Sequence, residues 1–332
     1  MAFTKFVIRA FSTSTLHFNA VKTVTVIGSG LMGSGIAQVA AATGHKVTLV
    51  DKTKEIVDKA EVSIKKSIDR IVKKKFPDDA KAQLKYSTDV LANLNMSTDV
   101  LTAVKSSDLV IEAIVENLDV KRELFGLLDN AAPEKTLFAS NTSSIPIKDI
   151  ASVTKRKDKF GGLHFFNPVP LMKLLEVIRI PETSDETYNL LDAFGKALGK
   201  TTVQCKDTPG FIVNRLLVPY MVEAIRLVER GDASPRDVDT AMKLGAGYPM
   251  GPFELLDYVG LDTTKFIIDG WSKRDPENPL FKPSPILNKL VDDNKLGLKT
   301  GEDNILSSIM DDIVKIMTGS FSLSPHLDTD FT

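Results

Sequence analysis

The segment from Val21 to Asp51 constrains the fold of this chain more than any other. It opens with an apolar β-branched run, Val24 to Ile27, which predicts a strand. The glycine-rich turn follows at once, with the residues Gly28, Ser29, Gly30, Leu31, Met32 and Gly33. Apolar residues at helical spacing come next, and a second short strand ends at Asp51. This order of elements predicts a Rossmann-type, doubly wound α/β sheet with a dinucleotide site, because such a site needs a strand, a tight turn, a helix, a second strand and an acid in succession.

Each part of such a turn has a physical task, and the chain supplies a residue for each. Gly28 permits the turn, Gly30 lets the backbone approach a pyrophosphate, and Gly33 allows the helix to pack against the strand. The helix N-terminus offers N–H groups and positive potential to the anion. Asp51 would accept hydrogen bonds from the ribose hydroxyls and would repel a 2′-phosphate. The predicted cofactor is therefore NAD rather than NADP.

Length and composition exclude several classes of protein. The 332 residues suggest about two domains. The net charge of −1 gives no reason to expect nucleic acid as a partner. A single cysteine, Cys205, rules out an internal disulfide, and the four histidines have no metal-ligand spacing, so no metal is expected. No stretch approaches the ~20 apolar residues of a transmembrane helix.

The first 20 residues differ from the rest of the chain. No Asp or Glu occurs before Asp51, while Lys5 and Arg9 stand among hydroxyl and apolar residues. This composition is typical of a mitochondrial transit peptide, with a cut expected near Phe11 or Ser12. A leader without a targeting role is the alternative.

A lysine-rich helical arm is predicted over about residues 53–97. Residues 52–85 hold eleven Lys or Arg against six Asp or Glu. The expected buried stripe is Ile56, Ala60, Ile64, Ile68 and Ile71. Pro77 is expected to end the helix, followed by a looser stretch to about Thr98. Ser67 and Lys74 lie two helical turns apart and share a face, which is either solvated or able to hold a polyphosphate.

Polar residues follow the carboxyl ends of two further predicted strands. The run from Asp108 to Ile114 precedes Glu116 and Lys121, which begin a helix. The run from Thr136 to Ser140 precedes the cluster Asn141, Thr142, Ser143 and Ser144. Open α/β sheets bind ligands at this edge. The cluster either caps a loop or hydrogen-bonds a substrate.

Glu176 lies inside an apolar β-like run, Leu174 to Ile178. A carboxylate in such a strand needs a partner, and His164 is the nearest candidate, twelve residues upstream. The pair is either a catalytic base with its orienting acid or a structural histidine with a buried partner. Asn167 and two prolines follow His164 in extended or turn geometry.

A domain boundary is predicted at Asp207 to Gly210. The NAD-binding domain then spans residues 21–207, and an all-α domain spans residues 208–301. Long amphipathic patterns, such as Phe211 to Arg230, support helices in this second part.

The chain resembles one family through these motifs, the L-3-hydroxyacyl-CoA dehydrogenases of mitochondrial fatty acid β-oxidation. The resemblance runs from about Val21 to Gly301. The blocks that carry it, besides the glycine turn, are Glu112 to Asn117, Ser140 to Ser144, Gly162 to Pro170, Asp207 to Arg215 and Gly245 to Pro252.

The resemblance implies NAD-dependent oxidation of L-3-hydroxyacyl-CoA to 3-ketoacyl-CoA. It implies that His164 and Glu176 form the acid–base pair, with Ser143 and Asn214 near the 3-oxygen of the substrate. Ser67, Lys74 and Ser143 would meet the coenzyme A substrate. The further residues implied at the NAD site are Asp51, Glu116, Lys121, Ser143, Asn167 and Lys299. A homodimer formed through the helical domain, in the mitochondrial matrix, is also implied.

The chain departs from the family pattern after Gly301. Residues 302–332 form an atypical tail in place of the usual short glycine-aromatic ending. One alternative is therefore an NAD-binding protein whose turnover the tail impairs. A related dehydrogenase acting on another 3-hydroxy acid is a second alternative.

Overall fold

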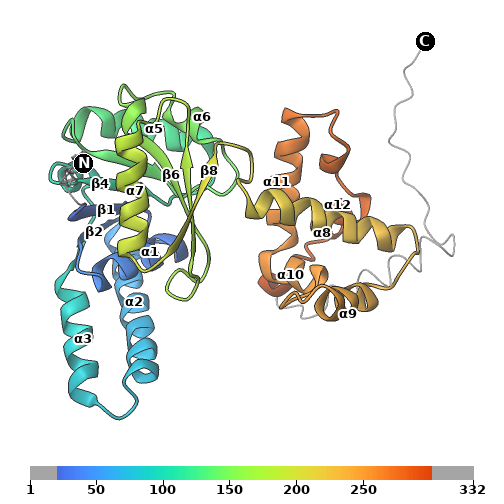
Figure 1. The fold of residues 1–332 in the computed structure, drawn as a ribbon, viewed down its shortest axis with the longest axis horizontal. Coiled ribbons are helices and arrows are strands. Elements are labelled where there is room, and N and C mark those ends of the chain that lie inside the picture. The colour runs from blue at the N-terminus through green and yellow to red at the C-terminus, as the bar shows by residue number, and fades with distance from the viewer. Residues whose placement is uncertain (1–20, 301–332) are drawn as a thin grey trace, which may run out of the picture. The chain divides into compact units, whose positions relative to one another are not determined.

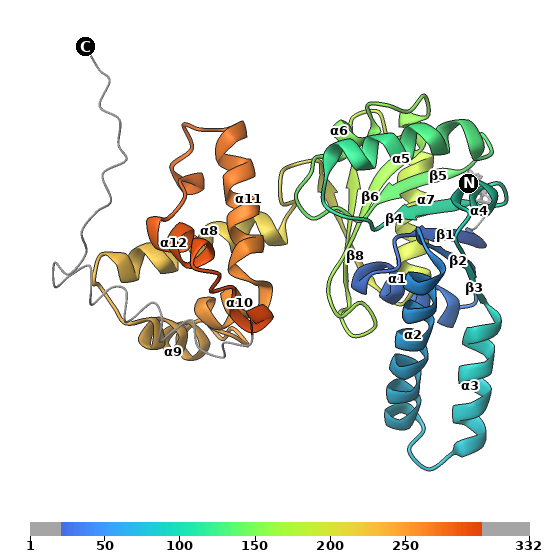
Figure 2. The same cartoon turned by 180° about the vertical axis from the view of Figure 1, so that it is seen from behind.

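The computed structural model describes residues 21–300. The predicted transit peptide, residues 1–20, and the atypical tail, residues 302–332, lie outside the described residues. The chain divides into two compact units between Thr208 and Pro209. Figures 1 and 2 show the ribbon from two opposite sides.

The first unit is built on one eight-stranded sheet with the strand order β3-β2-β1-β4-β5-β6-β7-β8. All neighbouring strands are parallel except β6 and β7, which pair antiparallel. The strands are β1 Thr23–Ile27, β2 Lys46–Val50, β3 Leu94–Ser97, β4 Leu109–Glu112, β5 Leu137–Ser140, β6 Phe160–Phe165, β7 Leu174–Arg179 and β8 Thr201–Lys206. This is the Rossmann-type sheet that the glycine turn predicted.

Helices cover both faces of the sheet. Helix α7 lies over one face in Figure 1, and α5 and α6 lie over the other in Figure 2. The helical segments of this unit are α1 Leu31–Ala42, α2 Lys54–Lys75, α3 Ala80–Ala92, α4 Val100–Val104, α5 Leu118–Ala131, α6 Ile147–Ala151, η1 Lys157–Lys159 and α7 Asp185–Ala197. Ser184 caps α7, since its side chain accepts from the N–H of Thr187, and Gly199 follows the helix at φ 73°.

Helices α2 and α3 form a hairpin arm that projects from the sheet (Figures 1 and 2). The looser stretch expected after Pro77 is therefore wrong, because this stretch holds α3 and the edge strand β3. Asp79 begins α3 by accepting from the N–H of Ala82 at 2.8 Å. An Asp two residues after a proline is an N-cap signal that outweighs the helix break.

The buried stripe of α2 also differs from the expected one. The buried residues are Val57, Ala60, Ile64, Ile68 and Val72. Ile56 is 41 % exposed, and Ile71 is only partly buried. The helix carries two adjacent apolar faces, and spacing alone could not say which one packs against the protein. Ile56 and Ile71 belong to the second face, which lines a groove described below.

The second unit is helical, as predicted. Its segments are α8 Val213–Glu229, α9 Pro235–Gly245, α10 Pro252–Val259, α11 Leu261–Arg274, η2 Pro279–Phe281, α12 Pro285–Asp292 and η3 Gly297–Thr300. Its core includes Val222, Phe253, Ile268 and Leu287, all completely buried. Across residues 21–300, no helix combines the length and the apolar character needed to cross a bilayer.

The start of β4 is tied to the start of β1 by one carboxylate. Asp108 accepts hydrogen bonds from the N–H groups of Thr23 at 3.0 Å and Lys22 at 3.1 Å, and from Lys135 Nζ at 2.9 Å. Burial opposes ionisation of this carboxyl, but the donors lower its pKa to about 2. The ionised form therefore stabilises the fold.

We expect Asp108→Asn to lower the free energy of unfolding by about 1–2 kcal/mol at pH 7. Because the folded-state pKa lies below the ordinary value of 3.8, this stabilisation is present above about pH 4 and is lost as the pH falls toward 2. Urea unfolding at pH 7, 5, 4 and 3 should show the two proteins converging. The exposed Asp69 serves as the control, since Asp69→Asn should change nothing.

Candidate active site

The polar residues singled out in the sequence gather at one edge of the sheet. Strands β1, β4, β5 and β6 are mutually parallel, so their carboxyl ends share this edge. The glycine turn follows β1, Glu112 and Ser140 end β4 and β5, and His164 is the penultimate residue of β6. Parallel α/β sheets place their ligands at this edge.

The three glycines of the turn differ in what surrounds them. Gly28 has φ 99°, and a Cβ there would lie 2.5 Å from the Ala113 carbonyl oxygen. A Cβ on Gly33 would lie 1.7 Å from the carbonyl oxygen of Gly28. A Cβ on Gly30 would meet no protein atom within 4 Å. Gly28 and Gly33 are therefore needed by the fold itself, whereas Gly30 borders open space of the kind that a pyrophosphate needs.

Asp51 follows β2 and points toward the same turn. Its Oδ2 accepts from the N–H and hydroxyl of Ser29 at 2.7 and 2.8 Å, and its Oδ1 accepts from the Lys52 N–H at 2.7 Å. These bonds fix the carboxylate beside the glycine turn, where the fingerprint predicts a ribose. The set of Gly30, Asp51 and the α1 N-terminus fits a dinucleotide.

His164 and Glu176 are directly opposite each other in the antiparallel pair β6–β7. His164 Nδ1 lies 2.6 Å from Glu176 Oε2, with the histidine 5 % exposed and the glutamate completely buried. The sequence predicted this pairing, and the structure contains it. An Nδ1–H that donates to a carboxylate leaves Nε2 as the basic nitrogen of the ring. The pair can thus exchange a proton at Nε2.

The Cys205 thiol belongs to β8, the strand paired with that of Glu176. Burial and the nearby Glu176 and Asp207 carboxylates raise its pKa to about 11. It therefore stays protonated at neutral pH and is a poor nucleophile.

Glu116 organises the turn that follows β5. Its Oε1 accepts from the Thr142 hydroxyl at 2.6 Å and from the N–H groups of Ser143 and Ser144 at 3.0 and 3.1 Å. Burial opposes ionisation, but the Lys121 ammonium and these donors hold the pKa of Glu116 below its ordinary value. The charged carboxylate fixes the backbone of Ser143.

Lys121 is enclosed beneath this turn, with an exposure of 1 %. Its Nζ lies 2.6 Å from the buried Glu112 and 3.2 Å from Glu116. Glu112 also accepts from the Ser140 hydroxyl at 2.6 Å. The ion-pair partners of the Lys121 ammonium are these two carboxylates. Direct contact between Lys121 and a cofactor therefore stays a prediction.

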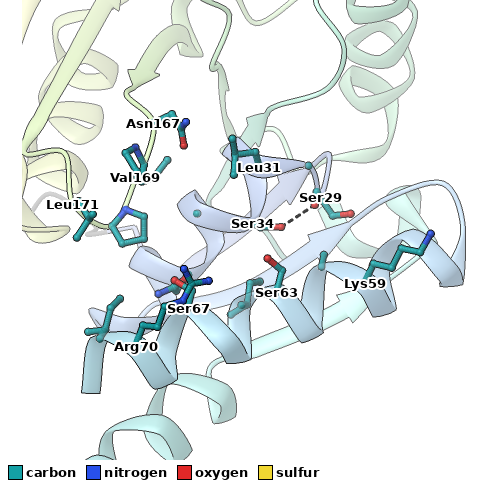
Figure 3. A pocket seen from close by; sticks show the side chains of 18 of the residues that line it. Ser29, Leu31, Ser34, Lys59, Ser63, Ser67, Arg70, Asn167, Val169 and Leu171 are labelled. Carbon is teal, nitrogen blue, oxygen red and sulfur yellow. Dashed lines mark hydrogen bonds between the residues drawn. The ribbon is translucent and has the colours of Figure 1, made fainter. Parts of the chain in front are cut away.

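A groove of about 690 Å³ lies between α1, the arm helix α2 and the loop after β6 (Figure 3). This volume is within the range of ligand pockets. Ser67 and Lys74 both line it, as does the edge of the glycine turn. Arg70 also lines it and was not singled out from the sequence. Its spacing of three from Ser67 and four from Lys74 is the signal that could have found it.

The remaining predicted residues are divided between the two units. Asn167 lines the groove, and Ser143 lies in the turn that Glu116 fixes. In the second unit, Asn214 stands in the first turn of α8, and Lys299 Nζ lies 2.7 Å from Asp262 Oδ1. The contacts of Asn214 and Lys299 with substrate or cofactor stay predictions. Within the described ranges, no group of three or more His, Cys, Asp or Glu is placed to hold a metal ion.

The fold and site define an NAD-binding dehydrogenase of the Rossmann class with a histidine–carboxylate pair. The family model for the NAD-binding domain of 3-hydroxyacyl-CoA dehydrogenase matches residues 23–208, and that for the C-terminal domain matches residues 210–305. The chain belongs to the 3-hydroxyacyl-CoA dehydrogenase family. It is therefore an NAD-dependent oxidoreductase.

Individual relatives agree with the family. The mitochondrial hydroxyacyl-coenzyme A dehydrogenase of Homo sapiens is 63 % identical over 282 residues, which cover 85 % of this chain and 90 % of the relative. A probable 3-hydroxyacyl-CoA dehydrogenase of Caenorhabditis elegans is 60 % identical, over 89 % of this chain and 95 % of the relative. Mammalian relatives named as mitochondrial enzymes support a mitochondrial location.

A solved structure supports the same assignment. The crystal structure of (S)-3-hydroxybutyryl-CoA dehydrogenase from Ralstonia eutropha matches with a TM-score of 0.80 at 40 % identity. The match covers 85 % of this chain and 97 % of that chain.

The glycines give a matched pair of variants. Gly30→Ala should fold normally, because φ −63° suits alanine and the space is open, but should weaken NADH binding at least tenfold. Gly33→Ala should lower the free energy of unfolding by about 2 kcal/mol or more, because its Cβ has no room. Thermal unfolding and NADH fluorescence titration measure the two effects. Normal NADH affinity in Gly30→Ala would contradict the predicted approach of the pyrophosphate.

Proposed function

We propose that this chain oxidises L-3-hydroxyacyl-CoA thioesters to 3-ketoacyl-CoA with His164 and Glu176 as its acid–base pair. The observation that carries this proposal is the 2.6 Å hydrogen bond between their side chains, nearly excluded from water at the ligand edge of the sheet. A histidine with one nitrogen held by a carboxylate presents the other for proton transfer.

In the oxidation, His164 Nε2 takes the proton of the 3-hydroxyl group. Glu176 holds the ring in the required tautomer and stabilises the imidazolium that forms. A bound NAD would supply the acceptor for the hydride that leaves the same carbon. In the reverse direction, the imidazolium of His164 returns the proton to the 3-keto oxygen.

Ser143 and Asn214 hydrogen-bond the 3-oxygen of the substrate in this proposal. Glu116 fixes the backbone of Ser143 through its 3.0 Å hydrogen bond, which supports a precise position for the serine hydroxyl. NAD is held by the glycine turn and Asp51 in this proposal. The further residues of its site are Glu116, Lys121, Ser143, Asn167 and Lys299. The buried Lys121 acts by neutralising Glu116 and Glu112.

The coenzyme A part of the substrate binds in the groove beside the arm helix α2. Ser67 offers a hydroxyl, and Arg70 and Lys74 offer positive charge on the same wall. Coenzyme A carries a diphosphate and a 3′-phosphate, which cationic side chains bind well. A free 3-hydroxy acid has no group that would need this wall.

The remaining parts of the proposal concern the setting of the enzyme. Residues 1–20 target the chain to the mitochondrial matrix, in agreement with their acid-free, basic composition. Residues 21–207 bind NAD, and residues 208–301 contribute Asn214 and the surface of a homodimer. Exposed apolar side chains in this second unit, such as Leu244 at 83 %, support an interface there.

His164→Ala should reduce kcat for acetoacetyl-CoA by about 10²- to 10⁴-fold, because proton transfer loses its donor. The affinity for NADH should stay within about twofold of the wild type. NADH consumption and NADH titration measure the two quantities on the full chain. Glu176→Gln serves as the matched variant, with a smaller loss of kcat.

Two other outcomes would contradict the proposal. Loss of both turnover and NADH binding in His164→Ala would make the histidine structural. A wild-type chain that binds NADH but does not turn over would favour the NAD-binding protein with an inhibitory tail.

Ser67→Ala combined with Lys74→Met should raise KM for acetoacetyl-CoA about tenfold and leave kcat nearly unchanged, because both residues bind the part of the substrate that does not react. The same variant should leave KM for the pantetheine thioester unchanged, since that substrate lacks the nucleotide. Equal KM values of the wild type for the two thioesters would refute the assignment of the groove.

A further inference from the structure

The loop between β6 and β7, residues 166–173, forms one wall of the groove. Asn167, Val169 and Leu171 of this loop line the groove on the side away from α2, as Figure 3 shows. The loop begins two residues after His164 and ends just before the strand of Glu176. Its shape therefore bears on the groove, whereas His164 and Glu176 themselves lie in the paired strands β6 and β7 that flank the loop.

The loop is packed closely on helix α1. Val169 is 2 % exposed, and a Cβ placed on Gly35 of α1 would lie 2.8 Å from the Val169 Cβ. The N–H groups of Leu171 and Met172 both donate to the Pro168 carbonyl, at 2.9 and 3.0 Å. A compact turn is thus pressed against the helix that begins at the glycine turn.

Lys200 forms two hydrogen bonds with the backbone of this turn. Its ammonium donates to the carbonyl of Val169 at 2.5 Å and to the carbonyl of Met172 at 2.7 Å. The lysine is 9 % exposed, and no carboxylate within residues 21–300 pairs with it. The next residue extends the link, since the Thr201 N–H donates to the Lys173 carbonyl at 2.7 Å.

Burial of an ammonium without a counter-ion is costly, and here the burial lowers the pKa of Lys200. The cost is offset by charge-assisted hydrogen bonds to two carbonyls three residues apart in the same loop. An apolar side chain at this position would leave both carbonyls without their donor. The contacts of Lys200 therefore serve the shape of the loop.

We propose that Lys200 is a positioning residue that fixes the 166–173 loop as the wall of the acyl-CoA groove and thereby sets KM for the thioester. This inference rests on the proposed binding of coenzyme A in the groove. Lys200 itself touches neither substrate nor cofactor, because its ammonium is directed at backbone carbonyls of the loop.

The test compares Lys200→Met with Lys196→Met in the full chain. Lys200→Met should raise KM for acetoacetyl-CoA about tenfold, with kcat and NADH affinity within about twofold of the wild type. Lys200→Arg keeps several donors and should raise KM only about threefold. Lys196, in the last turn of α7 shortly before Lys200, is exposed and pairs with Asp192, so Lys196→Met should match the wild type.

Two results would overturn the proposal. An unchanged KM in Lys200→Met would show that the loop does not need the ammonium. A joint loss of kcat, NADH affinity and thermal stability would show a lysine that only supports the fold. If Lys200→Met does not fold, Lys200→Gln, which is shorter and uncharged, carries the test, and an unchanged KM there overturns the proposal.

A pantetheine thioester separates failure of this inference from failure of the proposed function. If the wild type binds acetoacetyl-CoA better than the pantetheine thioester but Lys200→Met has a normal KM, only the role of Lys200 fails. If the wild type does not distinguish the two thioesters, the groove does not bind coenzyme A. The assignment of the groove and the role of Lys200 then both fail, while the acid–base role of His164 and Glu176 is judged by the His164→Ala result.

Discussion

The site is organised by the close approach of Gly33, at the start of α1, to the carbonyl of Gly28 at the end of β1. A Cβ on Gly33 would lie 1.7 Å from that oxygen, and one on Gly28 would lie 2.5 Å from the carbonyl of Ala113. These approaches bring the start of α1, the end of β1 and the end of β4 together. A third close approach, of Gly35 to Val169, adds the loop after β6. The ligand edge is thus assembled by close approaches, two to backbone carbonyls and one to a valine side chain, that leave no room for a Cβ at these glycines.

Buried charges then fix the side chains at this edge. Lys121 joins Glu112 and Glu116, Glu176 holds His164, and Lys200 holds the groove wall. Removing one partner from such a group leaves an uncompensated polar atom, so each group resists displacement. Proton transfer and thioester binding require that the side chains touching the substrate are held rigidly. A small displacement of such a side chain lowers the reaction rate strongly.

Several parts of the site could be predicted from the sequence because their signals are local. The glycine turn, the acid after β2 and the shared face of Ser67 and Lys74 follow from spacing within one or two elements. The His164–Glu176 pair followed from the cost of burying a lone carboxylate in an apolar strand. Other parts were missed or wrong. Helix α3 was missed because Pro77 was expected to end the helical pattern. The expected buried stripe of α2 was right for three residues but contained Ile56 and Ile71 in place of Val57 and Val72.

The Rossmann class, the cofactor and the helical second unit could be predicted without a structure, because glycines, periodicity and caps act over short distances along the chain. Three features emerged only from the folded chain: α2 buries Val57 and Val72, Lys121 lies between two carboxylates, and Lys200 donates to the loop after β6. These features depend on contacts between residues far apart in the sequence. Helical or strand periodicity indicates only which face of an element is apolar. Which other element packs against that face depends on the tertiary contacts.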